Sequence, residues 1–159
     1  MATLTVSVPE GSTQNITGVV TIDAPLEQVF AAHINIEQFS QWFLRGNKVR
    51  VHHFNATSGG AWHLDELGDN GESIGFTGCY HEVALNERII WTFEFLGMPE
   101  RGHVLLERMD FIPVGNKTEI HVLTTFQSQA DRDGMIASGM EEGWRECIVA
   151  LGTMLERRS

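Results

Sequence analysis

Residues 140–156 read MEEGWRECIVALGTMLE, and this stretch decides the fold more than any other. Its large apolar residues recur every three or four positions, which is the spacing of one face of an α-helix. They are Met140, Trp144, Ile148, Leu151 and Leu155. We therefore expect one long helix from about Ala130 to Arg157, with this face directed at the concave side of an antiparallel sheet.

The segment before this helix predicts the sheet. Between Val49 and Gln127, runs rich in β-branched and aromatic residues are separated by Gly, Asn and Asp clusters, a pattern typical of strands and turns. Six strands are expected there, at residues 49–54, 60–67, 73–83, 88–96, 103–111 and 118–126.

The N-terminal part is expected to add a short strand and two short helices. The strand is Gly18–Ile22; the first helix has Asp23 as N-cap and Pro25 in its first turn and extends to about Asn35, and the second covers Ile36–Phe43. Residues 1–15 are expected to be a tail or an added edge strand, and residues 16–159 a single domain. The fold class predicted is α+β.

Composition excludes several kinds of partner. The chain has 159 residues, with 11 Lys+Arg against 21 Asp+Glu, a formal net charge of -10. Such a charge repels nucleic acid and anionic membrane surfaces, so neither is an expected partner. The N-terminus has no basic patch followed by an apolar run, and we expect a cytoplasmic protein. Cys79 and Cys147 are too few for a disulfide framework.

Matching the apolar faces of neighbouring strands predicts their registers. An even loop at residues 114–117 places Met109 opposite Val122 and Glu107 opposite Thr124. A hairpin around Leu85–Asn86 places Tyr80 opposite Trp91. The same hairpin places Gly78 opposite Phe93 and Glu82 opposite Ile89.

The resulting inner face is rich in aromatic residues and carries a few polar ones. The candidate ligand-binding residues are Trp42, Trp62, Tyr80, Glu82, Trp91, Phe93, Glu107, Met109, Thr124, Met140 and Trp144. A carboxylate among apolar neighbours is costly unless it is paired or protonated. Glu107 is therefore a satisfied buried acid, a ligand contact, or a sign that the register is wrong.

Metal and phosphate sites are not expected. His52 and His53 are adjacent and would point to opposite faces of a strand, and no His-x-x-x-His or Cys-x-x-His pair occurs. Phosphate-binding glycine loops and a Gly-x-Ser-x-Gly nucleophile are also absent, so we expect no cofactor. His33 lies near the end of the first helix, where it either interacts with the helix dipole, the favoured interpretation, or reaches the cavity mouth.

Several short motifs, in this order, resemble a known family. They are Ile22-Asp23-Ala24-Pro25 before Val29-Phe30, Trp42, Gly59-Gly60-Ala61-Trp62, Gly78-Cys79-Tyr80-His81-Glu82-Val83 before Glu87-Arg88-Ile89, Lys117-Thr118-Glu119-Ile120, and Gly143-Trp144. Together they resemble the domain shared with the activator of Hsp90 ATPase, over about residues 16–157. The resemblance implies the helix-grip fold of the START/Bet v 1-like (SRPBCC) superfamily, whose members hold apolar ligands between sheet and C-terminal helix. It implies no shared catalytic triad.

Three functions remain open at this point. The favoured one is binding of a small apolar or aromatic molecule in an internal cavity, without chemistry. The second is a cyclase-like or hydratase-like enzyme, with Glu107, Glu82, Tyr80 or His33 as general acid or base. The third is a chaperone-associated interaction domain, for which the sequence offers no support beyond the resemblance; a homodimer is left open.

Overall fold

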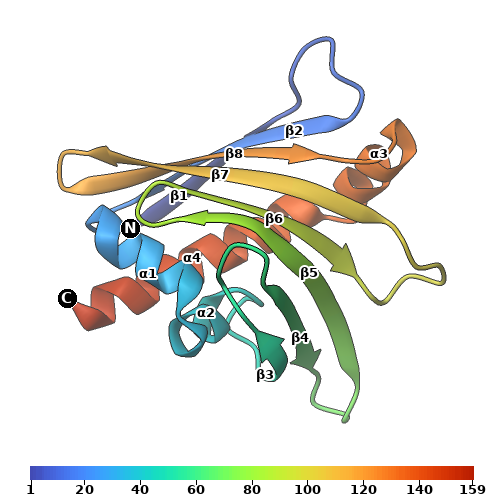
Figure 1. Ribbon diagram of the computed structural model, residues 1–159, viewed down its shortest axis with the longest axis horizontal. Helices are drawn as coiled ribbons and strands as arrows, with labels where there is room; N and C mark the ends of the chain where they lie inside the picture. The colour runs from blue at the N-terminus through green and yellow to red at the C-terminus, as the bar shows by residue number, and fades with distance from the viewer.

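A computed structural model describes all residues, 1–159, as one antiparallel sheet with four helices (Figure 1). The strands are β1 (Ala2–Ser7), β2 (Asn15–Ile22), β3 (Val49–Phe54), β4 (Ala61–Leu67), β5 (Ser73–Ala84), β6 (Arg88–Phe95), β7 (Val104–Val114) and β8 (Lys117–Thr125). The helices are α1 (Leu26–Ile34), α2 (Ile36–Trp42), α3 (Gln129–Ala137) and α4 (Met140–Arg158). The strand order is β1-β2-β8-β7-β6-β5-β4-β3.

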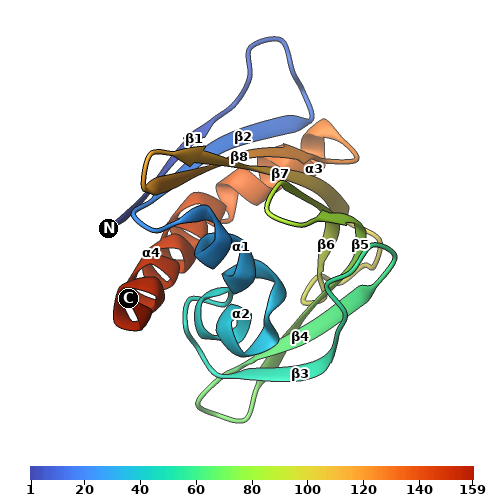
Figure 2. The same ribbon diagram turned by 60° about the vertical axis from the view of Figure 1, so that its left-hand side comes forward.

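The sheet curves around the helices, as predicted. Figure 2 shows it bending from β1 and β2 to β3 and β4, with α1, α2 and α4 on its concave side. Ile148 and Leu151 of α4 are buried in the main core. Trp144 rests on Gly18 of β2, where a β-carbon would overlap the indole ring. The helix-grip arrangement expected from the sequence is confirmed.

The expectation of one continuous C-terminal helix is wrong. α3 ends at Ala137 and α4 begins at Met140, because Gly139 adopts the left-handed conformation with a φ of 85°. The predicted N-cap of α1 is also wrong. Pro25 precedes the helix without a side-chain cap, and the Asp23 amide instead donates a hydrogen bond to the Met1 carbonyl, at 3.1 Å.

Most predicted registers are confirmed. Met109 pairs with Val122, and Glu107 with Thr124, because the turn between β7 and β8 has an even loop. Tyr80 pairs with Trp91, and Thr77 pairs with Glu94 in the same register. Gly78 lies between these two pairs, and the register places it opposite Phe93, as predicted.

The prediction for Glu82 is wrong, because a β-bulge lies between Tyr80 and Glu82. Glu82 therefore pairs with Ile90 rather than Ile89, and Val83 takes the position opposite Ile89. The displaced Glu82 carboxylate accepts a hydrogen bond from Arg88 Nε at 2.6 Å. It does not contribute to the inner face.

A second bulge, between Val51 and His53 of β3, overturns the prediction that His52 and His53 point to opposite faces. The extra residue interrupts the alternation of side chains, so both rings lie against His63 of β4. The ring centroids of His52 and His63 are 4.1 Å apart, and those of His53 and His63 are 5.9 Å apart.

The N-terminal residues form the edge strand that was one of the two alternatives. β1 pairs along its length with β2, from Ala2 opposite Ile22 to Ser7 opposite Thr17. Its Leu4 is buried in the main core. None of the helices combines the length and the apolar composition needed to cross a bilayer.

Candidate functional site

An apolar cavity lies among the concave face of the sheet, α1, α2 and α4. Its volume is about 300 Å³, and 20 of its 26 lining residues are hydrophobic. The aromatic lining residues are Phe39, Trp42, Phe43, Phe76, Tyr80, Trp91, Phe93, Phe126 and Trp144. Flat rings thus provide much of the wall.

Nine of the eleven candidate residues predicted from the sequence line this cavity. They are Trp42, Tyr80, Trp91, Phe93, Glu107, Met109, Thr124, Met140 and Trp144. The strand registers explain this result. Each of these residues that lies on a strand has its side chain on the inner face of the sheet, as the pattern of apolar residues predicted.

Trp62 and Glu82 do not line the cavity. Glu82 is turned outward by the bulge in β5. Trp62 is fully buried and stacks on Trp91, with ring centroids 4.7 Å apart and an interplanar angle of 21°. It supports the wall, and its buried indole Nε1 has no hydrogen-bond partner.

Glu107 is one of two carboxyl groups on the sheet side of the cavity lining; the other is Glu66. One carboxyl oxygen accepts a hydrogen bond from Trp91 Nε1 at 3.0 Å, and the other accepts one from Thr124 Oγ1 at 3.0 Å. Burial raises the pKa of Glu107, while these two hydrogen bonds act in the opposite direction. The residue still has accessible surface because it faces the cavity. Glu107 is thus a satisfied buried acid in a position to contact a ligand.

The Tyr80 hydroxyl is buried and has no hydrogen-bond partner. Burial raises the pKa of Tyr80, so the group stays protonated at neutral pH. A phenol both donates and accepts hydrogen bonds, and here both capacities are unused. Buried polar groups without partners are rare in proteins.

His33 lines the cavity as a neutral imidazole. Its Nδ1 lies 2.8 Å from the Val29 carbonyl, to which the ring N–H donates. Burial lowers the pKa of His33 to about 4. The alternative interpretation placed His33 at the cavity, and His33 is among the lining residues. The ring packs edge-on against Trp42 and Phe111, at centroid distances of 4.8 and 5.0 Å.

Comparison with known proteins identifies the family. The family model described as Activator of Hsp90 ATPase homolog 1-like protein matches residues 23–156. The chain belongs to this family. Among curated proteins, no sequence relative matches.

Several solved structures resemble this chain. A Rhodobacter sphaeroides protein is 22% identical with a TM-score of 0.84, covering 98% of this chain and 100% of that one. An Arthrobacter aurescens protein is 20% identical with a TM-score of 0.85, covering 96% and 91%. A Staphylococcus epidermidis protein is 24% identical with a TM-score of 0.81, covering 94% of each chain. At these identities the likeness shows the shared fold.

Sequence reasoning missed an ion pair in the cavity lining of this family member. Arg45 Nη2 donates to both oxygens of Glu66, each at 2.9 Å, and Asn47 Nδ2 donates to one of them at 2.6 Å. Arg45 lies in the loop after α2, where no periodic pattern predicts which side chains turn inward. The positive φ of Arg45, 59°, is likewise invisible in the sequence.

Cys147 also lines the cavity without being a nucleophile. Burial raises the pKa of its thiol to about 11, and the thiol donates to the Phe43 carbonyl at 2.6 Å. A thiol that remains protonated is unreactive at neutral pH.

A group of potential metal ligands lies on the outer face of the sheet, away from the cavity. His52, His63 and Asp65 place their ligand atoms within 4.8 Å of one another. The histidine spacing along the sequence did not predict this group. The members come from two strands, so linear spacing along one strand did not reveal them.

Proposed function

We propose that this protein binds one small, neutral, largely apolar molecule in the cavity between α4 and the sheet. The observation that carries the proposal is the apolar cavity, one of whose lining residues, Tyr80, has a buried hydroxyl without a hydrogen-bond partner. An unsatisfied buried polar group costs about 1–3 kcal/mol. A ligand with one hydrogen-bonding group would offset that cost while its apolar part fills the space.

The size and lining of the cavity support a compact, flat ligand. Binding pockets span roughly 300–1,000 Å³, and this cavity of about 300 Å³ lies at the lower end of that range. Aromatic walls offer wide contact surfaces, and Met109 and Met140 adapt to irregular shapes.

The charges around the cavity favour a neutral ligand. Arg45 is the one Lys or Arg in the lining, and its guanidinium is already bound to Glu66. An anionic ligand would therefore lack a cationic partner and would approach the Glu107 carboxyl. A neutral hydroxyl, carbonyl or amide group can form hydrogen bonds with Tyr80 or Glu107 without bringing a second negative charge next to the Glu107 carboxyl.

Fluorescence titration tests the proposal. N-phenyl-1-naphthylamine, a neutral probe that emits in apolar surroundings, should bind one-to-one, and 1-naphthol and naphthalene should displace it. Tyr80→Phe removes the hydroxyl without changing the shape of the ring. The affinity ratio of 1-naphthol to naphthalene should then fall about 2- to 12-fold, as a lost hydrogen bond of about 0.5–1.5 kcal/mol requires.

A matched control is Thr77→Val, which removes a hydroxyl from the same strand but outside the cavity lining. It should leave the affinity ratio unchanged. Failure of the probe to bind would contradict the proposal, and an unchanged ratio in Tyr80→Phe would contradict the role of the hydroxyl.

A reaction within the cavity is the second candidate function, and Glu107 is the observation that favours it. Burial raises the pKa of this carboxyl toward the range in which a group both gives and takes protons. Native mass spectrometry can identify a molecule that co-purifies with the protein. If the protein converts that molecule and Glu107→Gln binds it without conversion, the cavity is an active site; conversion by neither protein supports binding alone.

A further inference from the structure

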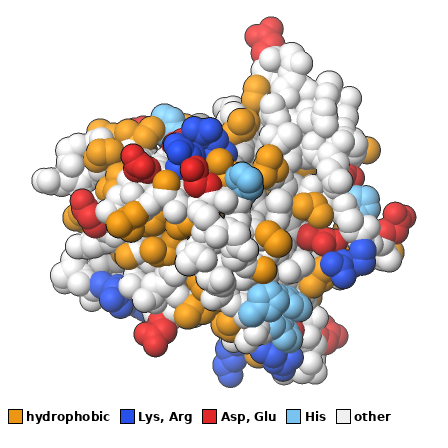
Figure 3. Space-filling model, viewed as in Figure 1, with side chains coloured by type: hydrophobic (Ala, Val, Ile, Leu, Met, Phe, Trp, Pro, Cys, Tyr) orange, Lys and Arg blue, Asp and Glu red, His pale blue; other side chains and the backbone are white.

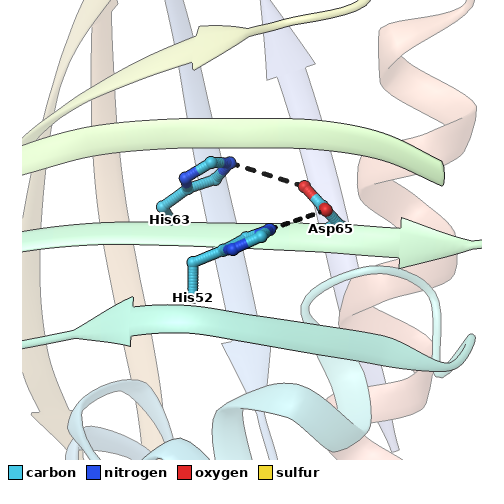
Figure 4. A group of neighbouring side chains, drawn as sticks. All are labelled: His52, His63 and Asp65. Atoms are coloured by element: carbon cyan, nitrogen blue, oxygen red, sulfur yellow. Dashed lines mark hydrogen bonds and ion pairs between the residues drawn. The ribbon is translucent and has the colours of Figure 1, made fainter.

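The outer face of the sheet carries a side-chain cluster that the proposed function does not use. His52 comes from β3, and His63 and Asp65 come from β4, with all three side chains on the same side of the sheet (Figure 4). His52 Nε2 lies 2.7 Å from Asp65 Oδ2, and His63 Nε2 lies 3.4 Å from Asp65 Oδ1. The inward neighbours Trp62 and Leu64 are fully buried, which places His63 and Asp65 on the opposite face from the cavity.

Two features of the backbone create this cluster. Arg50 of β3 pairs with Asp65 of β4, and His52 lies two residues after Arg50, so the ordinary alternation of strand side chains places His52 on the face that carries Asp65 and His63. Gly75 of β5 pairs with Asp65, and a β-carbon there would lie 3.0 Å from Asp65 Oδ1 and 3.4 Å from His63 Nε2. The same β-carbon would lie 2.9 Å from Leu96 Cδ1, so a glycine at this position allows Asp65, His63 and Leu96 to pack closely.

We propose that His52, His63 and Asp65 bind a divalent transition-metal ion of the zinc type. Two imidazole nitrogens and one carboxylate oxygen form a donor set that suits Zn²⁺ and its neighbours, whereas Ca²⁺ and Mg²⁺ prefer oxygen ligands alone. Ligand atoms about 2.0–2.1 Å from a tetrahedral zinc ion lie about 3.3 Å from one another. The three atoms, all within 4.8 Å, reach that geometry by small side-chain rotations.

The surroundings are open enough for an ion to enter and for a fourth ligand to bind. The side chains of His52 and His63 are 39% and 28% exposed, whereas that of Asp65 is only 12% exposed and is held in place. Figure 3 shows histidine side chains gathered at the surface over the part of the sheet that contains β3 and β4. The net charge of -10 also attracts cations to the protein.

One neighbour competes with the metal. Arg50 Nη1 lies 3.8 Å from Asp65 Oδ2, the oxygen that also faces His52. A bound cation would share Asp65 with this guanidinium and weaken their ion pair. Arg50 therefore lowers the affinity of the site, and its removal should increase it.

Calorimetric titration of the full chain with Zn²⁺, after chelator treatment and dialysis, tests the proposal. The wild-type protein should bind about one ion, and millimolar Ca²⁺ or Mg²⁺ should not compete. His52→Ala should lower the affinity at least tenfold, because it removes one of three ligands. Arg50→Gln should raise the affinity, by up to about 5-fold, as expected for a lost surface ion pair.

His121→Ala is the matched control, because His121 is an exposed strand histidine beside a single carboxylate, Glu119, at 2.9 Å. Its zinc affinity should equal that of the wild type. The proposal is overturned if the wild type shows no saturable zinc binding, or if His52→Ala binds zinc as tightly as His121→Ala. Because His52 is exposed, its replacement leaves the core intact.

Discussion

Gly143 of α4 offers a way to fill the cavity from within. It lines the cavity, and a β-carbon added to it meets no atom within 4 Å. In Gly143→Leu, burying the leucine side chain contributes about 1.5–3 kcal/mol to the free energy of unfolding. Replacing a helical glycine adds roughly 1 kcal/mol, and ordering the side chain costs about 0.5–1 kcal/mol. We expect a net stabilisation of about 1.5–3.5 kcal/mol together with loss of probe binding.

The matched control is Gly134→Leu in α3, where the added β-carbon also meets no atom but the position is exposed to solvent. Its free energy of unfolding should rise by roughly 1 kcal/mol, the gain from replacing a glycine within a helix. It should bind the naphthylamine probe like the wild type. Urea denaturation measures both free energies of unfolding. The reasoning is refuted if Gly143→Leu is no more stable than Gly134→Leu and still binds the probe with wild-type affinity.

Two further predictions concern buried polar groups. Because burial raises the pKa of Glu107 above its ordinary value of 4.5, the native state binds more protons than the unfolded state, and stability falls as the pH rises from 4.5 through the folded-state pKa. The side chain of Glu107→Gln stays neutral at every pH. In urea denaturation, its free energy of unfolding relative to that of the wild type should therefore increase with pH over that window. A difference that stays constant with pH would contradict this prediction. Thr118→Val should cost about 1–3 kcal/mol in the same assay, since the fully buried Thr118 hydroxyl donates to the Ala24 carbonyl at 2.8 Å; no loss of stability would show that this carbonyl finds another partner.

Sequence periodicity predicted the sheet, its curvature and much of the inner face. The pairing of Met109 with Val122 followed from matching two apolar faces across an even loop, because any other register would expose one of them. The same argument placed Glu107 beside Thr124. Such predictions succeed where one pattern extends over several residues.

The errors occurred where a single residue changes the pattern. A bulge moved Glu82 away from the inner face, and another placed His53 on the same face as His52 and opposite His63. Neither bulge could be predicted from the alternation of apolar residues. The break between α3 and α4 had a local signal, the Ser138-Gly139 pair, which the strong helical periodicity after it outweighed. Trp62 was placed on the correct face, but the pattern does not tell a wall residue from one buried behind it.

The central claim is that a neutral apolar molecule occupies the cavity beside Glu107. Two-dimensional ¹H–¹⁵N NMR of the four tryptophan indole groups tests it most directly, because Trp91 Nε1 donates to Glu107 and Trp42 Nε1 donates to the Ala32 carbonyl at 2.9 Å. On titration with N-phenyl-1-naphthylamine, the Trp91 indole signal should shift most and should saturate at one equivalent. Indole signals that stay unchanged, while backbone amides of the outer sheet face shift, would contradict the account.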